Sequence, residues 1–345
     1  MRAATAGEVQ TVLGPVAPDL LGLVLPHEHI LCDVTPPGIA ASAGGQQVEI
    51  NLENVHEIRY HWVCHYGNHI LDDVTVAIEE VARFERAGGG AIVELTICGI
   101  KPNPAGLAEI SRATGVPIVA GTGYYIEAHA GGFFTGCSVD QLAHKMIDGV
   151  KNGLGDSGVR AGIIGEIGVS DPWSSAEQRV MTAAVLAQQE TGASINVHPG
   201  RQPFSPLEIV RFVRRLGGDP ARLVISHLDR TLFDVASVAR LLDDGCIAEW
   251  DFFGIESAYY PFADIDLPND GQRLNLIQVL VSQGYGNRIL ISQDICTKTR
   301  LVRWGGHGYA HLIEAVLPMM RRKGFSETEI TQITELTPRR LLTLV

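Results

Sequence analysis

Eight short apolar runs separated by longer amphipathic stretches are the feature that most constrains the fold of this chain. The runs, rich in Val, Ile and Leu, span residues 23–29, 90–96, 117–124, 161–167, 194–198, 222–227, 246–252 and 288–294. The stretches between them, such as 73–87 and 175–191, repeat apolar residues at helical spacing. This alternation favours repeated βα units around a parallel sheet. Eight strands are the number that closes a (β/α)8 TIM barrel, which we therefore predict.

The length and composition fit one large barrel. Of the 345 residues, 46% are hydrophobic and 19% are charged, which supplies a large core. Although about 150 residues per domain would suggest two domains, one barrel commonly takes about 250 residues and tolerates long insertions. No linker interrupts the rhythm, so we expect a single domain over 1–345. The longest departure, at about 32–70 after the first strand, is predicted to be a loop insertion over the barrel mouth.

Charge and cysteine usage restrict the partners and the compartment. The formal net charge of −12 disfavours nucleic acid, because phosphate binding needs a basic face. No apolar run is long enough for a signal peptide or a membrane span. The six cysteines are scattered and form no Cys-x-x-Cys pair, which is typical of reduced thiols. We expect a cytoplasmic protein with no membrane partner.

Four histidines and two carboxylates fall at the C-terminal ends of the predicted strands, where barrel enzymes keep their active sites. They are His27, His29, Glu166, His198, His227 and Asp294. Because strand residues two apart point to the same side, His27 and His29 can bind one ion while Glu28 points away. Such donors suit Zn²⁺, Mn²⁺, Co²⁺ or Fe²⁺ better than Ca²⁺ or Mg²⁺. One residue of this kind is explained by loop capping, whereas six together predict a metal centre.

The motifs that carry these residues resemble the phosphotriesterase family of the amidohydrolase superfamily, and within it the phosphotriesterase-related branch. The matching blocks are LPHEH at 25–29, GGGAIVE at 88–94, AGIIGEIG at 161–168, HPGR at 198–201, SHLDRT at 226–231, EWDFFG at 249–254, QDICTKTRL at 293–301 and GGHGY at 305–309. They keep the family order over nearly the whole chain. The resemblance therefore covers nearly all predicted strands rather than a single motif.

The resemblance implies two divalent metal ions, zinc first, with Mn, Co or Fe also compatible. The implied ligands are His27, His29 and Asp294 for one ion, His198 and His227 for the other, and Glu166 as the bridge. Founding members bridge the ions with a carboxylated lysine on the fourth strand, where this chain has no lysine. That difference matches the phosphotriesterase-related branch and argues against efficient organophosphate hydrolysis.

The implied mechanism is hydrolysis by a metal-activated hydroxide. Two ions about 3.5–4 Å apart share a hydroxide whose pKa they lower. Asp294 would carry the proton of the nucleophile to the leaving group, which matters most for amides. Tyr125 matches a tyrosine that points at the substrate carbonyl in related lactonases, although a packing aromatic at the barrel rim explains it equally well.

Cations just beyond the predicted ligands indicate a small anionic substrate. They are Arg201, Arg230, Lys298 and Arg300, and His307 in a glycine-rich loop is expected to shape the same pocket. The alternative is that these cations pair with Asp229, Glu249 and Asp251 or face solvent. Founding members have an acidic residue where Arg230 stands, so their proton relay is not expected here.

The resemblance implies hydrolysis of a small N-acyl amino or sulfonic acid, N-acetyltaurine first, to taurine and acetate. A lactonase or phosphoester hydrolase on the same metal centre is the alternative, and a non-catalytic ligand-binding barrel is the second. A homodimer is common in the family.

Two further sets of histidines need an interpretation. His61, His65 and His69 recur every fourth residue, which fits a second metal site or, preferably, a lid helix, whereas His129 and His144 are interpreted as structural.

Overall fold

The computed structural model describes residues 2–37, 39, 49–61, 65–256 and 260–345, and its centre is one parallel sheet. The strands are β3 (Val24–Glu28), β6 (Ala91–Glu94), β7 (Ile118–Thr122), β8 (Ala161–Gly168), β9 (Ile195–His198), β10 (Leu223–Ile225), β11 (Ile247–Trp250) and β12 (Ile289–Ile291), paired in that order. The two edges also meet, because the backbone nitrogen of Asp294 donates to the His27 carbonyl at 3.2 Å. The predicted (β/α)8 barrel is confirmed.

Each predicted apolar run coincides with one of these strands. Seven strands lie within their runs, while β8 extends one residue beyond its run, to Gly168. Strands of a closed parallel barrel are covered on both faces, by side chains inside and helices outside. In β8, for example, all eight residues are buried. This two-sided burial explains why the sequence shows continuous apolar runs rather than an alternation of polar and apolar residues.

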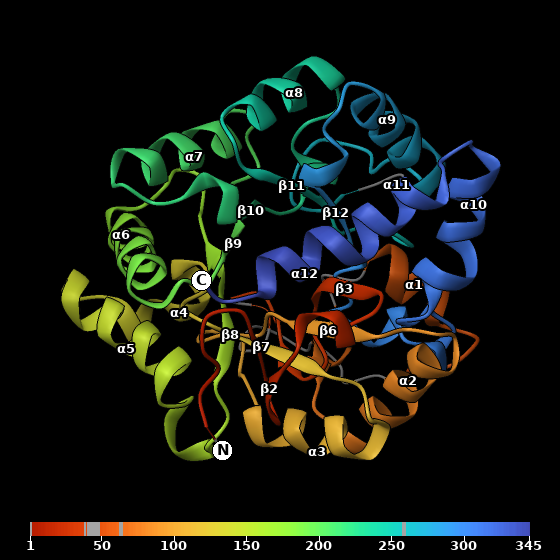
Figure 1. Ribbon diagram of the computed structural model, residues 1–345. Coiled ribbons are helices and arrows are strands. Elements are labelled where there is room, and N and C mark those ends of the chain that lie inside the picture. Colours follow the sequence, from red (N-terminus) through yellow and green to blue (C-terminus); the bar gives the residue numbers. More distant parts are fainter. Residues whose placement is uncertain (1, 38, 40–48, 62–64, 257–259) are drawn as a thin grey trace.

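Helices form a ring around the strands in Figure 1. The longer ones are α2 (Val74–Arg86), α3 (Pro104–Thr114), α4 (Glu127–Phe134), α5 (Val139–Lys151), α6 (Ser175–Thr191), α7 (Ser205–Arg215), α8 (Val235–Asp243) and α9 (Asp270–Ser282). The Asp73 carboxylate accepts from two backbone nitrogens at the start of α2, and Ser174 and Glu177 form a capping box on α6. The helices predicted over 73–87 and 175–191 are confirmed.

The two ends of the chain close one mouth of the barrel. A hairpin of β1 (Val9–Thr11) and β2 (Gly14–Val16), which the sequence did not predict, lies at this end with α12 (Thr337–Leu342). Ser194 and Arg222, which precede β9 and β10, both donate to the Leu341 carbonyl, at 2.6 and 2.9 Å. The N-terminal ends of the strands are therefore covered, and the C-terminal ends face the opposite mouth.

The segment after β3 contains several short elements. β4 (Cys32–Asp33) pairs with β5 (Ile70–Leu71), and α1 (Val55–Tyr60) and η3 (Tyr66–His69) lie between them. The preferred lid helix carrying His61, His65 and His69 is wrong, because the backbone angles of His61 and His65 are not helical. Among the described residues, no metal-type cluster includes these three histidines. No described helix has the length and apolar character needed to cross a lipid bilayer.

The packing of α2 on the barrel can be tested at Phe84. This ring is fully buried in the main core, against the backbone of Gly89. Replacing Phe84 with Ala leaves a cavity, so we expect a loss of about 3–5 kcal/mol in the free energy of unfolding by urea. The control is Phe133→Ala, because Phe133 is 61% exposed and should change stability by less than about 0.5 kcal/mol. Equal effects would contradict the described packing.

Candidate metal centre

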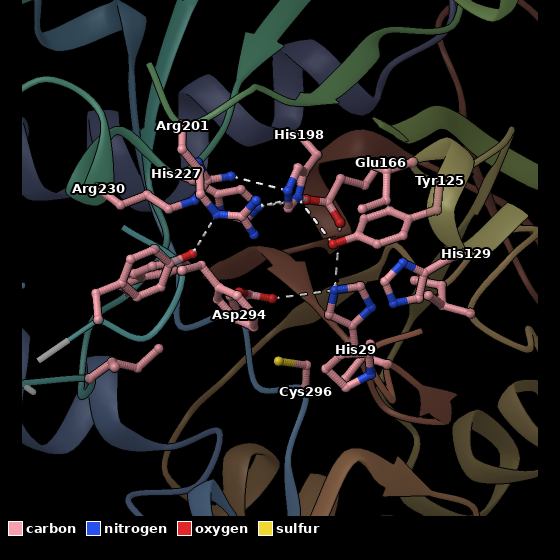
Figure 2. Close-up of a pocket in the computed structure, with 18 of the residues that line it drawn as sticks. His29, Tyr125, His129, Glu166, His198, Arg201, His227, Arg230, Asp294 and Cys296 are labelled. Carbon is pink, nitrogen blue, oxygen red and sulfur yellow. Dashed lines mark hydrogen bonds and ion pairs between the residues drawn. The ribbon is translucent and has the colours of Figure 1, made fainter. Parts of the chain in front are cut away.

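The six predicted ligands lie together at the open end of the barrel, around Glu166. Figure 2 labels His29, Glu166, His198, His227 and Asp294 among them. Its Oε1 is 2.6 Å from His227 Nε2, 2.8 Å from His198 Nδ1 and 3.6 Å from His27 Nε2. Its Oε2 is 3.8 Å from His29 Nε2. Glu166 therefore touches ligands from both predicted metal sites, as a bridging carboxylate must.

Asp294 lies close to His27 and His29, the two histidines predicted to bind the same ion. Its Oδ1 lies 3.3 Å from His29 Nε2 and 3.8 Å from His27 Nε2. Two groups with mutually close ligand atoms result, one of His27, Glu166 and His227 and the other of His27, His29 and Asp294. The structure thus brings together all six residues that the strand-end pattern singled out.

Two of the ligands adopt backbone conformations that non-glycine residues rarely use. His227 has φ 55° and Asp294 has φ 46°, both in the left-handed region just beyond a strand. Asp251 holds His227 at two points, since its carboxylate accepts from the backbone nitrogen at 2.9 Å and from Nδ1 at 2.8 Å. Such strained residues persist where surrounding contacts determine them, and they cluster at functional sites.

Buried acceptors fix the orientation of three imidazoles. His227 Nδ1 contacts Asp251, His27 Nδ1 lies 3.0 Å from Glu249 Oε2, and His29 Nδ1 lies 3.0 Å from Thr96 Oγ1. With Nδ1 protonated toward these partners, the lone pair of each Nε2 points into the cluster. Partners of this kind are usual behind metal-binding histidines.

His198 is turned the other way. Its Nδ1 faces Glu166, and its Nε2 lies 3.1 Å from Arg230 Nη2. A neutral imidazole carries one proton, so Nδ1 can bind an ion only when Nε2 is the protonated nitrogen. Nε2 then no longer accepts a hydrogen bond from Arg230. His198 therefore cannot bind an ion through Nδ1 and accept a hydrogen bond from Arg230 at Nε2 at the same time.

One atom tests directly whether the cluster fits a metal ion. His27 Nε2 is buried and has no hydrogen-bond partner in the described structure. A buried polar atom without a partner costs free energy, and such atoms are rare. An ion between His27, Glu166 and Asp294 would supply the missing partner. Four imidazoles and two carboxylates are also a donor set that borderline divalent metals favour.

Electrostatics agree with this arrangement. Burial alone would raise the pKa of the Glu166 carboxyl, but His198, His27 and His227 around it hold that pKa well below its usual range. Glu28, by contrast, points away from the cluster as predicted, and its carboxylate accepts from Ser292 and from the backbone nitrogen of Ile295. Burial raises the pKa of Glu28 to about 8. Glu28 therefore supports the turn that carries Asp294.

A cavity of about 230 Å³ lies over the cluster. Of the predicted catalytic and substrate-binding residues, those that line it are Tyr125, Arg201, Arg230, Asp294 and Arg300. The Tyr125 hydroxyl is 3.3 Å from His198 Nδ1, which places this side chain at the cluster rather than only at the rim. Burial raises the pKa of the Tyr125 phenol well above its ordinary value, so the hydroxyl keeps its proton.

Two predicted substrate-binding residues are not in this cavity. The Lys298 ammonium lies 5.7 Å above the Trp304 ring and lines a small separate cavity. His307 packs against Gly254 and His311 in a neighbouring cavity. The structure therefore does not bring Lys298 and His307 to the cavity over the cluster, and substrate contact by these two residues stays a prediction.

The alternative partners of the cations are wrong. Glu249 and Asp251 contact the metal-type histidines, and Asp229 forms an ion pair with Arg273. None of these three acids pairs with the predicted substrate-binding cations within the described residues.

The cavity also contains residues that the sequence did not predict. His129, interpreted as structural, lines it beside Tyr125, with the two rings 5.2 Å apart. Its position four residues after Tyr125, beyond the end of β7, was the available signal. Cys296 and an apolar wall that includes Ile100 and Ile126 also contribute. His144, in contrast, is exposed and contacts Asp148 at 3.2 Å.

A parallel barrel whose open end gathers imidazoles around a shared carboxylate is the architecture of a metal-dependent hydrolase. Residues 7–342 match the model of the phosphotriesterase family, and the chain belongs to that family. The family consists of metal-dependent hydrolases, so this protein is an enzyme of that class.

Relatives similar to this chain cover it almost completely. The N-acetyltaurine hydrolase of Tetraodon nigroviridis is 37% identical over 98% of both chains, and that of Homo sapiens is also 37% identical over 98% of both. A crystal structure of a resiniferatoxin-binding protein from Rhodobacter sphaeroides superposes with a TM-score of 0.91 at 32% identity. It covers 97% of this chain and 95% of that chain.

Asp251, which contacts His227 and His27, provides the first test of the metal centre. Replacing Asp251 with Asn removes the carboxylate that orients His227 and contacts His27. We expect affinity for zinc to fall by about 10–100-fold, measured as metal retained during dialysis against a chelator. Asp156→Asn, at an exposed acid, is the matched control. Unchanged metal retention in Asp251→Asn would show that Asp251 does not support the centre.

Proposed function

We propose that this protein cleaves the amide bond of a small N-acyl amino or sulfonic acid, with N-acetyltaurine, which gives taurine and acetate, as the first candidate. The observation that carries the proposal is the position of Glu166, whose two oxygens contact histidines of both halves of the cluster. The names of the similar relatives support the choice of substrate. The cationic side chains that line the cavity support an anionic substrate.

The residues that would hold the metals are those of the cluster. One ion would bind His27, His29 and Asp294, the other would bind His198 and His227, and Glu166 would contact both. Zinc is the first candidate for this binuclear centre, with Mn, Co and Fe as the other candidates. When bound, such a pair polarises the substrate carbonyl and lowers the pKa of water toward about 7.

We assign proton transfer to Asp294. Its side chain lines the cavity, with Oδ1 3.3 Å from His29 Nε2. We assign to it the proton released when water attacks the carbonyl carbon, which it then donates to the departing amine nitrogen. This donation is needed because an unprotonated amine leaves poorly.

We assign orientation of the substrate to Tyr125. Its protonated hydroxyl faces the cluster beside His198, and its ring stands edge-on to the rings of His129 and His198. We assign to it a hydrogen bond donated to the substrate carbonyl oxygen, which becomes stronger as negative charge develops there.

The role of Asp294 is tested by Asp294→Asn, which removes the proton acceptor with little change in size. We expect kcat for N-acetyltaurine, measured with zinc or manganese supplied, to fall by about 10²–10⁴-fold. Asp140→Asn, at an exposed acid on α5, is the control and should keep full activity. Removing the metal with a chelator should abolish activity in both proteins.

A substrate panel tests the reaction itself. It contains N-acetyltaurine, N-acetyl amino acids, lactones and an aryl phosphotriester, and we expect N-acetyltaurine to have the highest kcat/KM. A lactone or phosphotriester in first place would contradict the proposed amide hydrolysis. A loaded metal pair that hydrolyses none of these compounds would favour a non-catalytic binding barrel.

A further inference from the structure

Arg230 is a buried cation with one donor nitrogen that has no partner. It ends η6 (Leu228–Arg230), directly after the ligand His227, and is only 2% exposed. Its Nη2 donates to the Pro199 carbonyl at 3.0 Å and contacts His198 Nε2. Its Nη1 is buried and has no hydrogen-bond partner in the described structure. Figure 2 shows the side chain reaching toward the cluster.

No described carboxylate lies within ion-pair distance of Arg230. Its neighbour Asp229 pairs with Arg273, and Asp251 contacts histidines of the cluster. A charge buried without a counter-ion is costly, and arginine prefers planar anions that accept two hydrogen bonds. Because the guanidinium lines the cavity over the metal-type cluster, the counter-ion it lacks can arrive as part of a ligand.

A second cation lies on the same side of the cavity. Arg201 follows β9, the neighbour of β10 in the barrel, and also lines the cavity. Its guanidinium lies 4.8 Å from the centre of the Phe262 ring and contacts the Tyr260 hydroxyl at 3.4 Å. Arg201 and Arg230 therefore give this side a local positive charge in a chain whose net charge is −12.

Aliphatic side chains line another part of the cavity wall. Val34, Ile100 and Ile126 come from the segments after β3, β6 and β7, and β3 and β6 lie across the barrel from β9 and β10. No described cation of the cavity comes from these three segments. Arg300, which follows β12, also lines the cavity, but its Nη1 lies 4.0 Å from Asp294 Oδ2, so it has a counter-ion. The side at β9 and β10 is therefore the favourable place for the charged end of a substrate, and the aliphatic wall is the favourable place for an uncharged end.

We propose that Arg230, supported by Arg201, binds the anionic group on the amine side of the substrate, while the uncharged acyl group lies against Val34, Ile100 and Ile126. This inference rests on the proposed amide hydrolysis and adds which residues bind the anionic group and which contact the acyl group. The substrate is an amide whose amine part carries a sulfonate or carboxylate and whose acyl part carries no charge.

A metal ion held by His198 Nδ1 would make Arg230 a better anion receptor. His198 Nε2 would then carry the proton and would no longer accept a hydrogen bond from Arg230 Nη2. Arg230 then has hydrogen-bonding capacity to fill at both Nη1 and Nη2. Two terminal nitrogens match the two oxygens that a sulfonate or carboxylate offers to a bidentate guanidinium.

The test compares two substrates on the metal-loaded enzyme. N-acetyltaurine carries a sulfonate, and N-acetylethanolamine has a neutral hydroxyl on the same two-carbon link. Hydrogen bonds to charged groups contribute enough for about a 10–100-fold effect. We expect Arg230→Gln to lower kcat/KM for N-acetyltaurine by that factor, mainly through KM, and to change the neutral substrate by less than about threefold. Arg230→Lys should retain part of the preference for the anion.

Controls separate anion binding from damage to the centre. Arg211→Gln, at an exposed arginine of α7, should leave both substrates unchanged. The metal content of every variant is measured, because Arg230 contacts His198. Equal losses on both substrates with full metal content would overturn the assignment of Arg230 to the anion.

A binding measurement keeps this inference distinct from the proposed function. Calorimetry with the metal-loaded protein and N-acetyltaurine needs no turnover. We expect the wild type to bind at least about tenfold more tightly than Arg230→Gln. Binding without hydrolysis would contradict the proposed function and leave the anion site standing. No binding to the wild type, or equal binding to the two proteins, would overturn the anion site.

Discussion

The site depends on a single buried carboxylate, that of Glu166, which lies among imidazoles brought in by three other strands. Its Oε1 lies within 3.6 Å of nitrogens from His27, His198 and His227. A carboxylate so far from water is stable only with positive partners around it. The closed barrel makes this arrangement possible, because closure directs the ends of β3, β8, β9, β10 and β12 to the same point. A divalent metal centre is the partner that these donors fit.

The donors are held by buried groups outside the cluster. Asp251 and Glu249 orient His227 and His27, while Glu28 supports the turn that carries Asp294. These acids stand at or next to strand ends, so the rigid sheet positions the ligands instead of mobile loops. Arginines and aliphatic side chains both line the cavity above the cluster. Under the proposed assignments, Arg201 and Arg230 bind the anionic end of the substrate, while the cluster supplies the metal ligands.

The strands and the six cluster residues were predictable because they depend on strong local patterns. Buried parallel strands require apolar runs, and residues at their ends must share one face of the barrel. The loops were less predictable because their backbone turns decide where a side chain points. Lys298 and Arg300 both lie in η8 (Lys298–Arg300), a 3₁₀ turn with about three residues per turn, so they face different directions. Gly305 and Gly308, with φ of 75° and 68°, flank the loop turn that carries His307.

The central claim is that one carboxylate holds two ions together, and anomalous diffraction from crystals of the zinc-loaded protein measures this directly. Data at the zinc absorption edge should show two peaks inside the barrel mouth. One should lie beside His27, His29 and Asp294, the other beside His198 and His227, with a Glu166 oxygen bound to each. A single peak, or peaks with Glu166 bound to neither, would contradict the account.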